Sequence, residues 1–286
     1  MINMETGTII KMISNQYTID TGNGEIIAKP RGKMRLNQSP VVGDVVQFEK
    51  VDDSYRIHSI EPRKNKLLRP SISNVDQALI VTSLKDPDFS DHLLNRLIFL
   101  VSLSHVKPVI VITKMDLIED CKPYEDELKK YEKAGYPIFY SYPGYNEQAL
   151  MELIDGKISV LCGQSGAGKS SLLNRLDPSF QLQTQEISKA LGRGKHTTRH
   201  CQLHKIRNGW VADTPGFSSL DFNYMDTSHL DEVILDFQPF LNQCRFKDCI
   251  HINEPDCAIK NAVSEKLINA SIYEDYKQIK ENKKWQ

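Results

Sequence analysis

Residues 163–170 read GQSGAGKS, and this octapeptide decides how the rest of the chain is interpreted. It fits the pattern G-x-x-x-x-G-K-[ST], in which glycines let successive backbone N–H groups face phosphate oxygens. The apolar run KISVLC comes directly before it, and the helical pattern SSLLNRL overlaps its end. A strand, a glycine-rich loop and a helix N-terminus in this order predict a site for the phosphates of a nucleotide rather than a chance turn.

Two side chains of this segment have specific expected roles. Lys169 is expected to reach the β- and γ-phosphates, and Ser170 is expected to bind Mg²⁺. The positive end of the following helix adds to the attraction for phosphate. The candidate nucleotide-binding residues of the segment are Gly163, Gln164, Ser165, Gly166, Ala167, Gly168, Lys169, Ser170 and Ser171.

Apolar strands and amphipathic helices alternate on the N-terminal side of this segment. Ser90 is the expected N-cap of one helix, and Gly135 is the expected end of another. Strands that are apolar throughout and alternate with helices predict a mainly parallel sheet covered on both faces. The expected strands are residues 77–84, 107–114, 136–142 and 157–162, and the expected helices are residues 90–105, 123–135, 146–154 and 170–176.

The chain changes character twice, which predicts a multidomain protein. Residues 1–68 read as about five short strands broken by Gly, Pro and Asp, which suits a small β-barrel of the oligonucleotide-binding (OB) type. Residues 69–225 carry the α/β pattern of a P-loop domain. Residues 226–286 combine helical patches with a cluster of cysteines.

Composition excludes several classes of protein. The formal net charge of the 286 residues is −1, so no global field indicates binding to nucleic acid or to a membrane. No apolar run reaches the roughly 18 residues of a membrane span. The N-terminus, MINMETGTII, lacks the apolar core of a signal peptide. A cytoplasmic protein without membrane contact is therefore expected.

A candidate reader of guanine precedes the phosphate loop by about fifty residues. It is the tetrapeptide TKMD, formed by Thr113, Lys114, Met115 and Asp116. Asp116 can accept hydrogen bonds from N1–H and the exocyclic amine of guanine, and adenine offers no matching pair of donors. A match of four residues is weak alone, but this one ends a buried strand, where open α/β sheets bind ligands. Ser141 ends the next strand and is placed to contact the base as well.

Two further segments complete the set of motifs found in GTPases. D-x-x-G occurs from Asp213 to Gly216, where Asp213 is expected to hold Mg²⁺ through water and the Gly216 N–H to sense the γ-phosphate. GKHTTRH lies between the phosphate loop and D-x-x-G, so either Thr197 or Thr198 is expected to close onto Mg²⁺ and γ-phosphate. The expected magnesium ligands are Ser170, Thr198 and Asp213.

The motifs follow the order 4-5-1-2-3 of their usual numbering in GTPases, which is a circular permutation. The adjacency of strands in a sheet matters more than the order of their synthesis, so such a permutation is physically cheap. With TKMD, GQSGAGKSSL, GRGKHTT, DTPGF and the cysteine cluster, nearly the whole chain resembles the circularly permuted, ribosome small-subunit-dependent GTPases of the RsgA, YjeQ or YloQ family. TKxD in place of NKxD is usual in that family.

The resemblance implies a specific biological setting. It implies a cytoplasmic bacterial GTPase that binds GTP or GDP with Mg²⁺ and contacts the immature 30S subunit and its 16S rRNA late in assembly. Hydrolysis in that family is slow alone and is stimulated by the small subunit. A monomer is expected, and other 30S assembly factors are further candidate partners.

The residue after D-x-x-G is Phe217, which cannot orient the attacking water as Gln does in many GTPases. His196, beside the switch threonines, is the best local candidate, and the resemblance points the same way; the expected catalytic set is His196, Thr197, Thr198 and Lys169. The alternatives are a group supplied by the ribosome, a potassium ion, or a His196 that contacts only RNA or solvent. The potassium device usually carries Asn where this loop has Gly166.

Four metal-ligand side chains crowd into one short stretch of the C-terminal segment. Cys244, Cys249, His251 and Cys257 form a Cys3His set that suits tetrahedral Zn²⁺. The spacing is not that of a common finger, so free buried thiols are the alternative, and the family resemblance favours zinc. Four protein ligands leave no open position, so a structural ion is expected.

RNA binding and the class of protein depend mostly on the resemblance. The stretch KPRGKMR places basic residues at positions 29, 31, 33 and 35, and reads either as a solvated loop or as a patch that follows phosphates. The basic residues 277–284 are a second candidate contact. The main rival to an enzyme is an RNA-binding module that uses GTP only as a structural ligand; a metabolic kinase fits TKMD and DTPG poorly.

Overall fold

The fold is described from a computed structural model that covers residues 4–30, 38–67, 71–179, 202–213, 222 and 225–281. The chain divides into two compact units. The first comprises residues 1–77, 147–162 and 170–217, and the second comprises residues 78–146, 163–169 and 218–286. Each unit is described in turn below.

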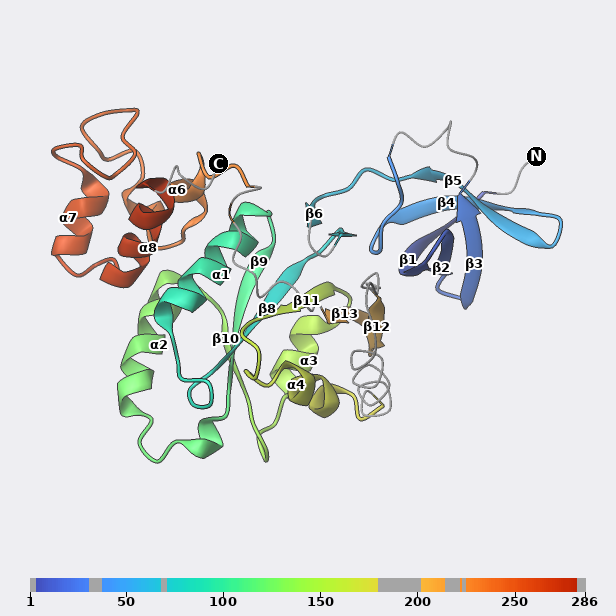
Figure 1. Cartoon of the computed structure of the whole chain (residues 1–286), viewed down its shortest axis with the longest axis horizontal. Coiled ribbons are helices and arrows are strands. Elements are labelled where there is room, and N and C mark those ends of the chain that lie inside the picture. The colour runs from blue at the N-terminus through green and yellow to red at the C-terminus, as the bar shows by residue number, and fades with distance from the viewer. Residues whose placement is uncertain are drawn as a thin grey trace, which may run out of the picture. The chain divides into compact units, whose positions relative to one another are not determined.

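A closed five-stranded barrel occupies the N-terminal part of the first unit, as the sequence predicts (Figure 1). Its strands pair in the order β1-β2-β3-β5-β4, and β1 closes the barrel against β4 through partners such as Gly7 and Val46. Closure leaves no free sheet edge, and the inward-facing apolar side chains fill the interior. The strands are β1 (Glu5–Ile13), β2 (Gln16–Asp20), β3 (Glu25–Pro30), β4 (Val45–Val51) and β5 (Ser54–Ile60).

A buried ion pair fixes the segment that leaves the barrel. Asp44 is fully buried and accepts hydrogen bonds from Arg63 at 2.6 Å and Ser73 at 2.5 Å. Gly43 has φ 89°, and a Cβ there would lie 2.1 Å from the carbonyl oxygen of Ser73. Only glycine permits this approach, which brings the short strands β6 (Lys66–Leu67) and β7 (Ile72–Ser73) against the barrel.

The first unit also contains three strands of the central sheet, β11 (Ile158–Cys162), β13 (Gly209–Asp213) and β12 (Leu203–Ile206). β11 and β13 are parallel, and β12 pairs antiparallel with β13 as the edge strand. Helices α3 (Gln148–Ile154) and α4 (Lys169–Leu176) accompany them, and Arg175 of α4 forms an ion pair with Glu147 at 2.9 Å. A single β-bridge joins Lys11 of the barrel to Gln202 beside β12.

The second unit contains the other three strands, β8 (Gln77–Ser83), β9 (Lys107–Thr113) and β10 (Ile138–Ser141). β8 begins in the first unit, where the backbone of Asp76 and the side chain of Gln77 bond to β11. The sheet order is therefore β10-β9-β8-β11-β13-β12. β10 pairs parallel with β9, and β11 pairs parallel with β13, as the apolar strand patterns predict, whereas the edge strand β12 pairs antiparallel with β13.

Two helices of the second unit have the terminal residue that the sequence predicts, Ser90 at the start of one and Gly135 at the end of the other. Ser90 caps α1 (Asp91–Leu103) by accepting a hydrogen bond from the Leu93 N–H, and Gly135 ends α2 (Lys122–Ala134) with φ 99°. The short η1 (Met115–Leu117) follows β9. None of the helices in the described ranges combines the length and the apolar character needed to cross a bilayer.

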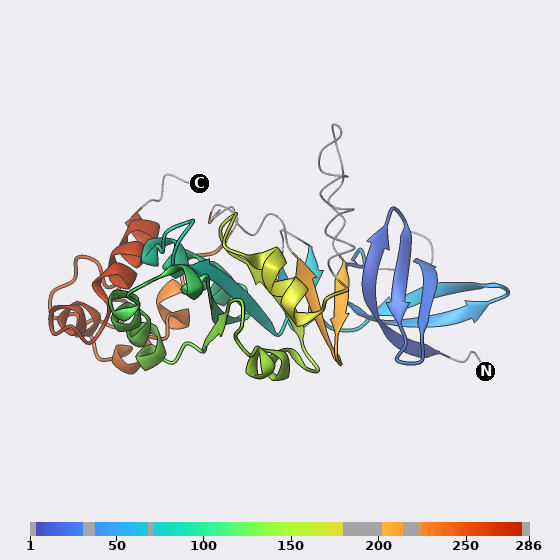
Figure 2. The ribbon, with the colours of Figure 1, turned by 90° about the horizontal axis from the view of Figure 1, so that it is seen from below.

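The C-terminal segment is helical and packs on α1 within the second unit (Figure 2). It contains α6 (Leu230–Val233), η2 (Gln238–Phe240), α7 (Ala258–Ser264) and α8 (Ala270–Glu281). Asp275 of α8 is buried and accepts a hydrogen bond from Asn95 at 2.8 Å, and Asn95 in turn accepts one from Tyr131 at 2.7 Å. This buried polar chain ties α8 to both α1 and α2, because each group in it would be costly to bury without a partner.

Candidate nucleotide site and candidate metal centre

The phosphate loop folds against the neighbouring strand β8 of the second unit. Gly163 has φ 134°, and a Cβ there would lie 2.1 Å from the carbonyl oxygen of Val81. Lys169 donates hydrogen bonds to the carbonyls of Gly163 at 2.7 Å and Gln164 at 2.8 Å. Glycine is thus required for the loop to pass so close to β8, and the ammonium group is held at the mouth of the loop.

Thr113 connects the predicted base reader to the phosphate loop. Its side chain is buried, and its hydroxyl donates a hydrogen bond to the carbonyl of Ala167 at 2.6 Å. The same oxygen lies 3.3 Å from the carbonyl of Thr82 in β8. A β-branched hydroxyl residue at this position therefore joins two loops that are 54 residues apart in the chain.

The other residues of the predicted base reader lie at the same edge of the sheet. Lys114 adopts a left-handed conformation, φ 59°, and its ammonium donates to the carbonyl of Asp86. Asp116 lies in η1, directly after this turn. Ser141 pairs with Thr113 in the parallel register of β10 and β9, so both strands end side by side. The structure thus brings three of the predicted nucleotide-binding segments together at the carboxyl ends of β8, β9 and β10, as expected for this class of sheet.

The expected metal and switch residues are described only in part. Ser170 and Ser171 lie in the first turn of α4, and the backbone of Asp213 ends β13. The side chain of Asp213 is outside the description, as are His196, Thr197, Thr198, Gly216 and Phe217. Their assigned roles in binding Mg²⁺, sensing the γ-phosphate and orienting water therefore stay predictions.

The four predicted zinc ligands converge on one point. The Nδ1 atom of His251 lies 3.4 Å from each of the Sγ atoms of Cys244, Cys249 and Cys257. All four ligand atoms lie within 4.8 Å of one another. Zn–S bonds of about 2.3 Å and Zn–N bonds of about 2.0 Å in a tetrahedron require ligand separations of this size. The donor set and its geometry fit a zinc ion with no open position.

A backbone scaffold supports this cluster, and the sequence interpretation missed it. The carboxylate of Glu254 accepts hydrogen bonds from the N–H groups of Ile250 and Ile252 at 3.0 and 2.9 Å. The hydroxyl groups of Tyr273 and Tyr276 donate to the carbonyls of His251 and Ile250, both at 2.8 Å. Glu254 lies three residues before the ligand Cys257 in the stretch EPDC, and this closeness was the only local signal for its role. The two tyrosines belong to α8, sixteen or more positions after Cys257, so no local pattern indicated them.

Part of the predicted basic loop belongs to a strand instead. Lys29 lies in β3 and pairs in register with Arg56 of β5. The positions 31, 33 and 35 lie outside the described residues. Lys29 therefore lies on a strand of the barrel and not in a loop between strands.

Sequence comparisons show which known proteins this chain resembles. A sequence model of the RsgA GTPase family matches residues 60–223, and one of the RsgA N-terminal domain matches residues 6–55. The small ribosomal subunit biogenesis GTPase RsgA 2 of Oceanobacillus iheyensis is 46% identical over 280 residues, which cover 96% of this chain and 95% of that protein. The RsgA of Leuconostoc citreum is 44% identical over 281 residues, which cover 96% and 93% of the two chains.

Two solved structures share the fold. The crystal structure of YloQ, a circularly permuted GTPase, matches with a TM-score of 0.84 and 34% identity, covering 99% of this chain and 96% of that chain. The crystal structure of YjeQ from Thermotoga maritima matches with a TM-score of 0.84 and 34% identity, covering 97% of each chain. The permuted order of motifs that the sequence predicts is thereby confirmed at the level of the fold.

Proposed function

Because this chain belongs to the RsgA GTPase family, we propose that it binds the small ribosomal subunit and acts late in the assembly of that subunit. Its membership makes it a GTP hydrolase, which converts GTP to GDP and phosphate. The match to small-subunit biogenesis GTPases carries the ribosomal part of the proposal, and the hydrogen bond from Thr113 to Ala167, which joins the predicted guanine reader to the phosphate loop, supports the nucleotide site.

The proposed nucleotide site combines side chains with backbone donors. Asp116 accepts the N1–H and amine protons of guanine, while Lys114 lies along the plane of the base and Ser141 closes the pocket. The backbone N–H groups of residues 163–171 surround the phosphates, and Lys169 neutralises the charge of the β- and γ-phosphates. Ser170, Thr198 and Asp213 would hold Mg²⁺, which would supply positive charge against the negative charge that develops on the phosphates during hydrolysis.

We propose that His196 orients the attacking water. Phe217 offers no hydrogen bond at the position where many GTPases place Gln, so another group must orient the water. Replacement of His196 by Ala is expected to leave nucleotide affinity unchanged and to reduce turnover stimulated by small subunits by at least about 100-fold. Unchanged stimulated turnover in this variant would assign the water to a ribosomal group instead.

The proposed division of labour follows the three regions of the chain. Residues 1–68 contact 16S rRNA through the barrel, residues 69–225 bind and hydrolyse GTP, and residues 226–286 form a helical segment ordered by one zinc ion. The closed barrel with Lys29 and Arg56 on paired strands supports an RNA-binding role, since ionic contacts to phosphates need basic side chains in a row. We place this monomer in the cytoplasm, where immature small subunits occur.

The experiment that tests the proposal measures GTP turnover with purified small subunits, large subunits and whole ribosomes. The expected result is slow hydrolysis by the protein alone and stimulation by small subunits only. A salt titration of the binding to small subunits should show affinity that falls with ionic strength, because phosphate contacts release counterions. Binding without any stimulation would favour the rival function, an RNA-binding module with GTP as a structural ligand.

A further inference from the structure

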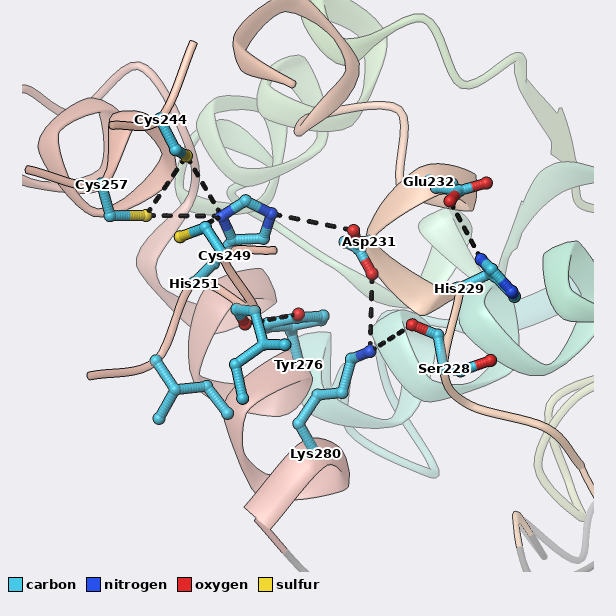
Figure 3. A network of polar contacts seen from close by, with 12 residues as sticks. Ser228, His229, Asp231, Glu232, Cys244, Cys249, His251, Cys257, Tyr276 and Lys280 are labelled. Atoms are coloured by element: carbon cyan, nitrogen blue, oxygen red, sulfur yellow. Dashed lines mark hydrogen bonds and ion pairs between the residues drawn. The ribbon is translucent and has the colours of Figure 1, made fainter. Parts of the chain in front are cut away.

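The two ring nitrogens of His251 face different groups. The Nδ1 atom of His251 faces the three cysteine sulfurs, each at 3.4 Å, so Nε2 points out of the cluster. That Nε2 atom lies 3.7 Å from Oδ2 of Asp231, as Figure 3 shows. Both side chains are shielded, with 5% of His251 and 19% of Asp231 exposed. The ring therefore stands between the metal position on one side and a carboxylate on the other.

Asp231 is itself held in place by a second ion pair. Its Oδ1 atom lies 3.4 Å from Nζ of Lys280, which also donates a hydrogen bond to the carbonyl of Ser228 at 2.6 Å (Figure 3). Lys280 belongs to α8, and its side chain is 11% exposed. Because α8 is anchored to α1 by Asp275, Lys280 approaches Asp231 from a fixed element. Two successive ion pairs thus connect α8 to the cluster, from Lys280 to Asp231 and from Asp231 to His251.

We propose that Asp231, oriented by Lys280, is the positioning residue that fixes the tautomer and orientation of His251 for zinc binding. A histidine that binds a metal through one nitrogen usually donates its other N–H to a carboxylate or carbonyl. Such a partner keeps the ligand nitrogen deprotonated and makes it a stronger donor to the metal. Asp231 lies on the side of the ring where that partner is needed, at the 3.7 Å distance of an ion pair rather than a hydrogen bond. This inference depends on the zinc ion of the proposed function.

The adjacent residue of the same helix provides a matched control. Glu232 also pairs with a histidine, His229, at 2.9 Å, but their side chains are 62% and 69% exposed. Both pairs join a carboxylate of α6 to an imidazole, and only the Asp231 pair leads to the cluster. If Asp231 contributes only a negative charge on α6, Asp231→Ala and Glu232→Ala should release zinc at the same rate.

The test uses the full chain and measures zinc rather than GTP turnover. Metal content of the wild-type protein is determined first, and one zinc per chain is expected. Zinc release to a chromogenic chelator is then followed, and Asp231→Ala is expected to release it 10- to 100-fold faster than Glu232→Ala. Asp231→Asn, which keeps an acceptor atom and loses the charge, should fall between the two. Lys280→Ala should accelerate zinc release less than Asp231→Ala does. Its control is Lys277→Ala, which removes an exposed ion pair with Glu281 on the same helix.

Three results would overturn the inference in distinguishable ways. Release from Asp231→Ala within twofold of Glu232→Ala would show that the carboxylate does not position the ligand. A lower melting temperature with unchanged zinc release would assign Asp231 to packing alone. A wild-type chain without zinc would remove the metal from the proposed function, while leaving the GTP site untouched. If Asp231→Ala does not fold, Asp231→Asn loaded with Co²⁺ serves instead, and an absorption spectrum and release rate identical to those of wild type would contradict the proposal.

Discussion

The phosphate loop and the metal segment solve the same problem, holding a loop in a fixed shape, by opposite means. Residues 163–168 follow the mostly buried strand β11, and their shape is set by glycine conformations and by the close approach of Gly163 to the carbonyl of Val81. In residues 241–257, all of which the structure describes, only His251, Ile252 and Cys257 are buried. The packing against β8 thus preorganises the first loop, whereas the second has too little core of its own and contains four side chains that are placed to hold a metal ion.

The comparison predicts that removing a phosphate-binding side chain leaves the fold intact. Lys169→Ala is expected to reduce GTP hydrolysis by at least about 100-fold, because no other described side chain of the loop carries a positive charge to the phosphates. Zinc content and melting temperature should remain those of the wild type. Turnover assays check the loss of hydrolysis, and metal analysis and thermal melting check that the fold is unchanged. Lys129→Ala, on the exposed face of α2, is the control. Loss of zinc in Lys169→Ala would contradict the independence of the two loops.

Removing a metal ligand should have the reverse effect. Cys257→Ser is expected to abolish zinc binding and to expose residues 241–257 to proteases, since a structural zinc site contributes several kcal/mol of folding free energy. The affinity for GTP should change by less than about threefold, because the strands β8 and β9 hold the nucleotide loop without the metal. Cys121→Ser, outside the cluster, is the control for general effects of cysteine loss. Protease protection equal to that of wild type would mean that the segment has sufficient core after all.

The buried carboxylate of Asp236, which precedes residues 241–257 in the chain, allows a third test with a smaller expected effect. Burial raises the pKa of Asp236 from 3.8 to about 6, although Tyr136 donates a hydrogen bond to it. The folded-state pKa lies above the unfolded value, so the stability that protonation provides is present below about pH 4 and is lost as pH rises through 6.

Asp236→Asn should therefore stabilise the protein by about 1 to 3 kcal/mol at pH 7.5 and have little effect at pH 4. Denaturant titrations at the two pH values measure the difference. A destabilised variant at pH 7.5 would show that the ionised carboxylate has a favourable partner. Glu232→Asn, at an exposed position four residues away, should show no such pH dependence beyond its surface ion pair.

Local patterns in the sequence predicted the elements of the sheet and the convergence of the four cysteine and histidine ligands, because each depends on spacing within a short stretch. Ser90 begins its helix and Gly135 ends its helix as expected, and the four predicted zinc ligands converge. Long-range polar contacts were not predictable. The hydrogen bond of Asn95 to Asp275 joins residues 180 positions apart, and no period or motif connects them. The role of Thr113 was likewise hidden, since its partner Ala167 contributes only a backbone carbonyl.

The most direct test of the permuted site is a change of base specificity. Asp116 precedes the phosphate loop in the chain, yet the fold places its turn at the same sheet edge. Xanthine carries a carbonyl oxygen where guanine carries its amine, so Asp116→Asn supplies a donor in place of the carboxylate acceptor. Affinities of wild type and Asp116→Asn for GTP and xanthosine triphosphate should be measured side by side. The prediction is that the variant loses at least about 100-fold in affinity for GTP and prefers xanthosine triphosphate. An unchanged preference for GTP would contradict the claim that TKMD and the phosphate loop form one nucleotide site.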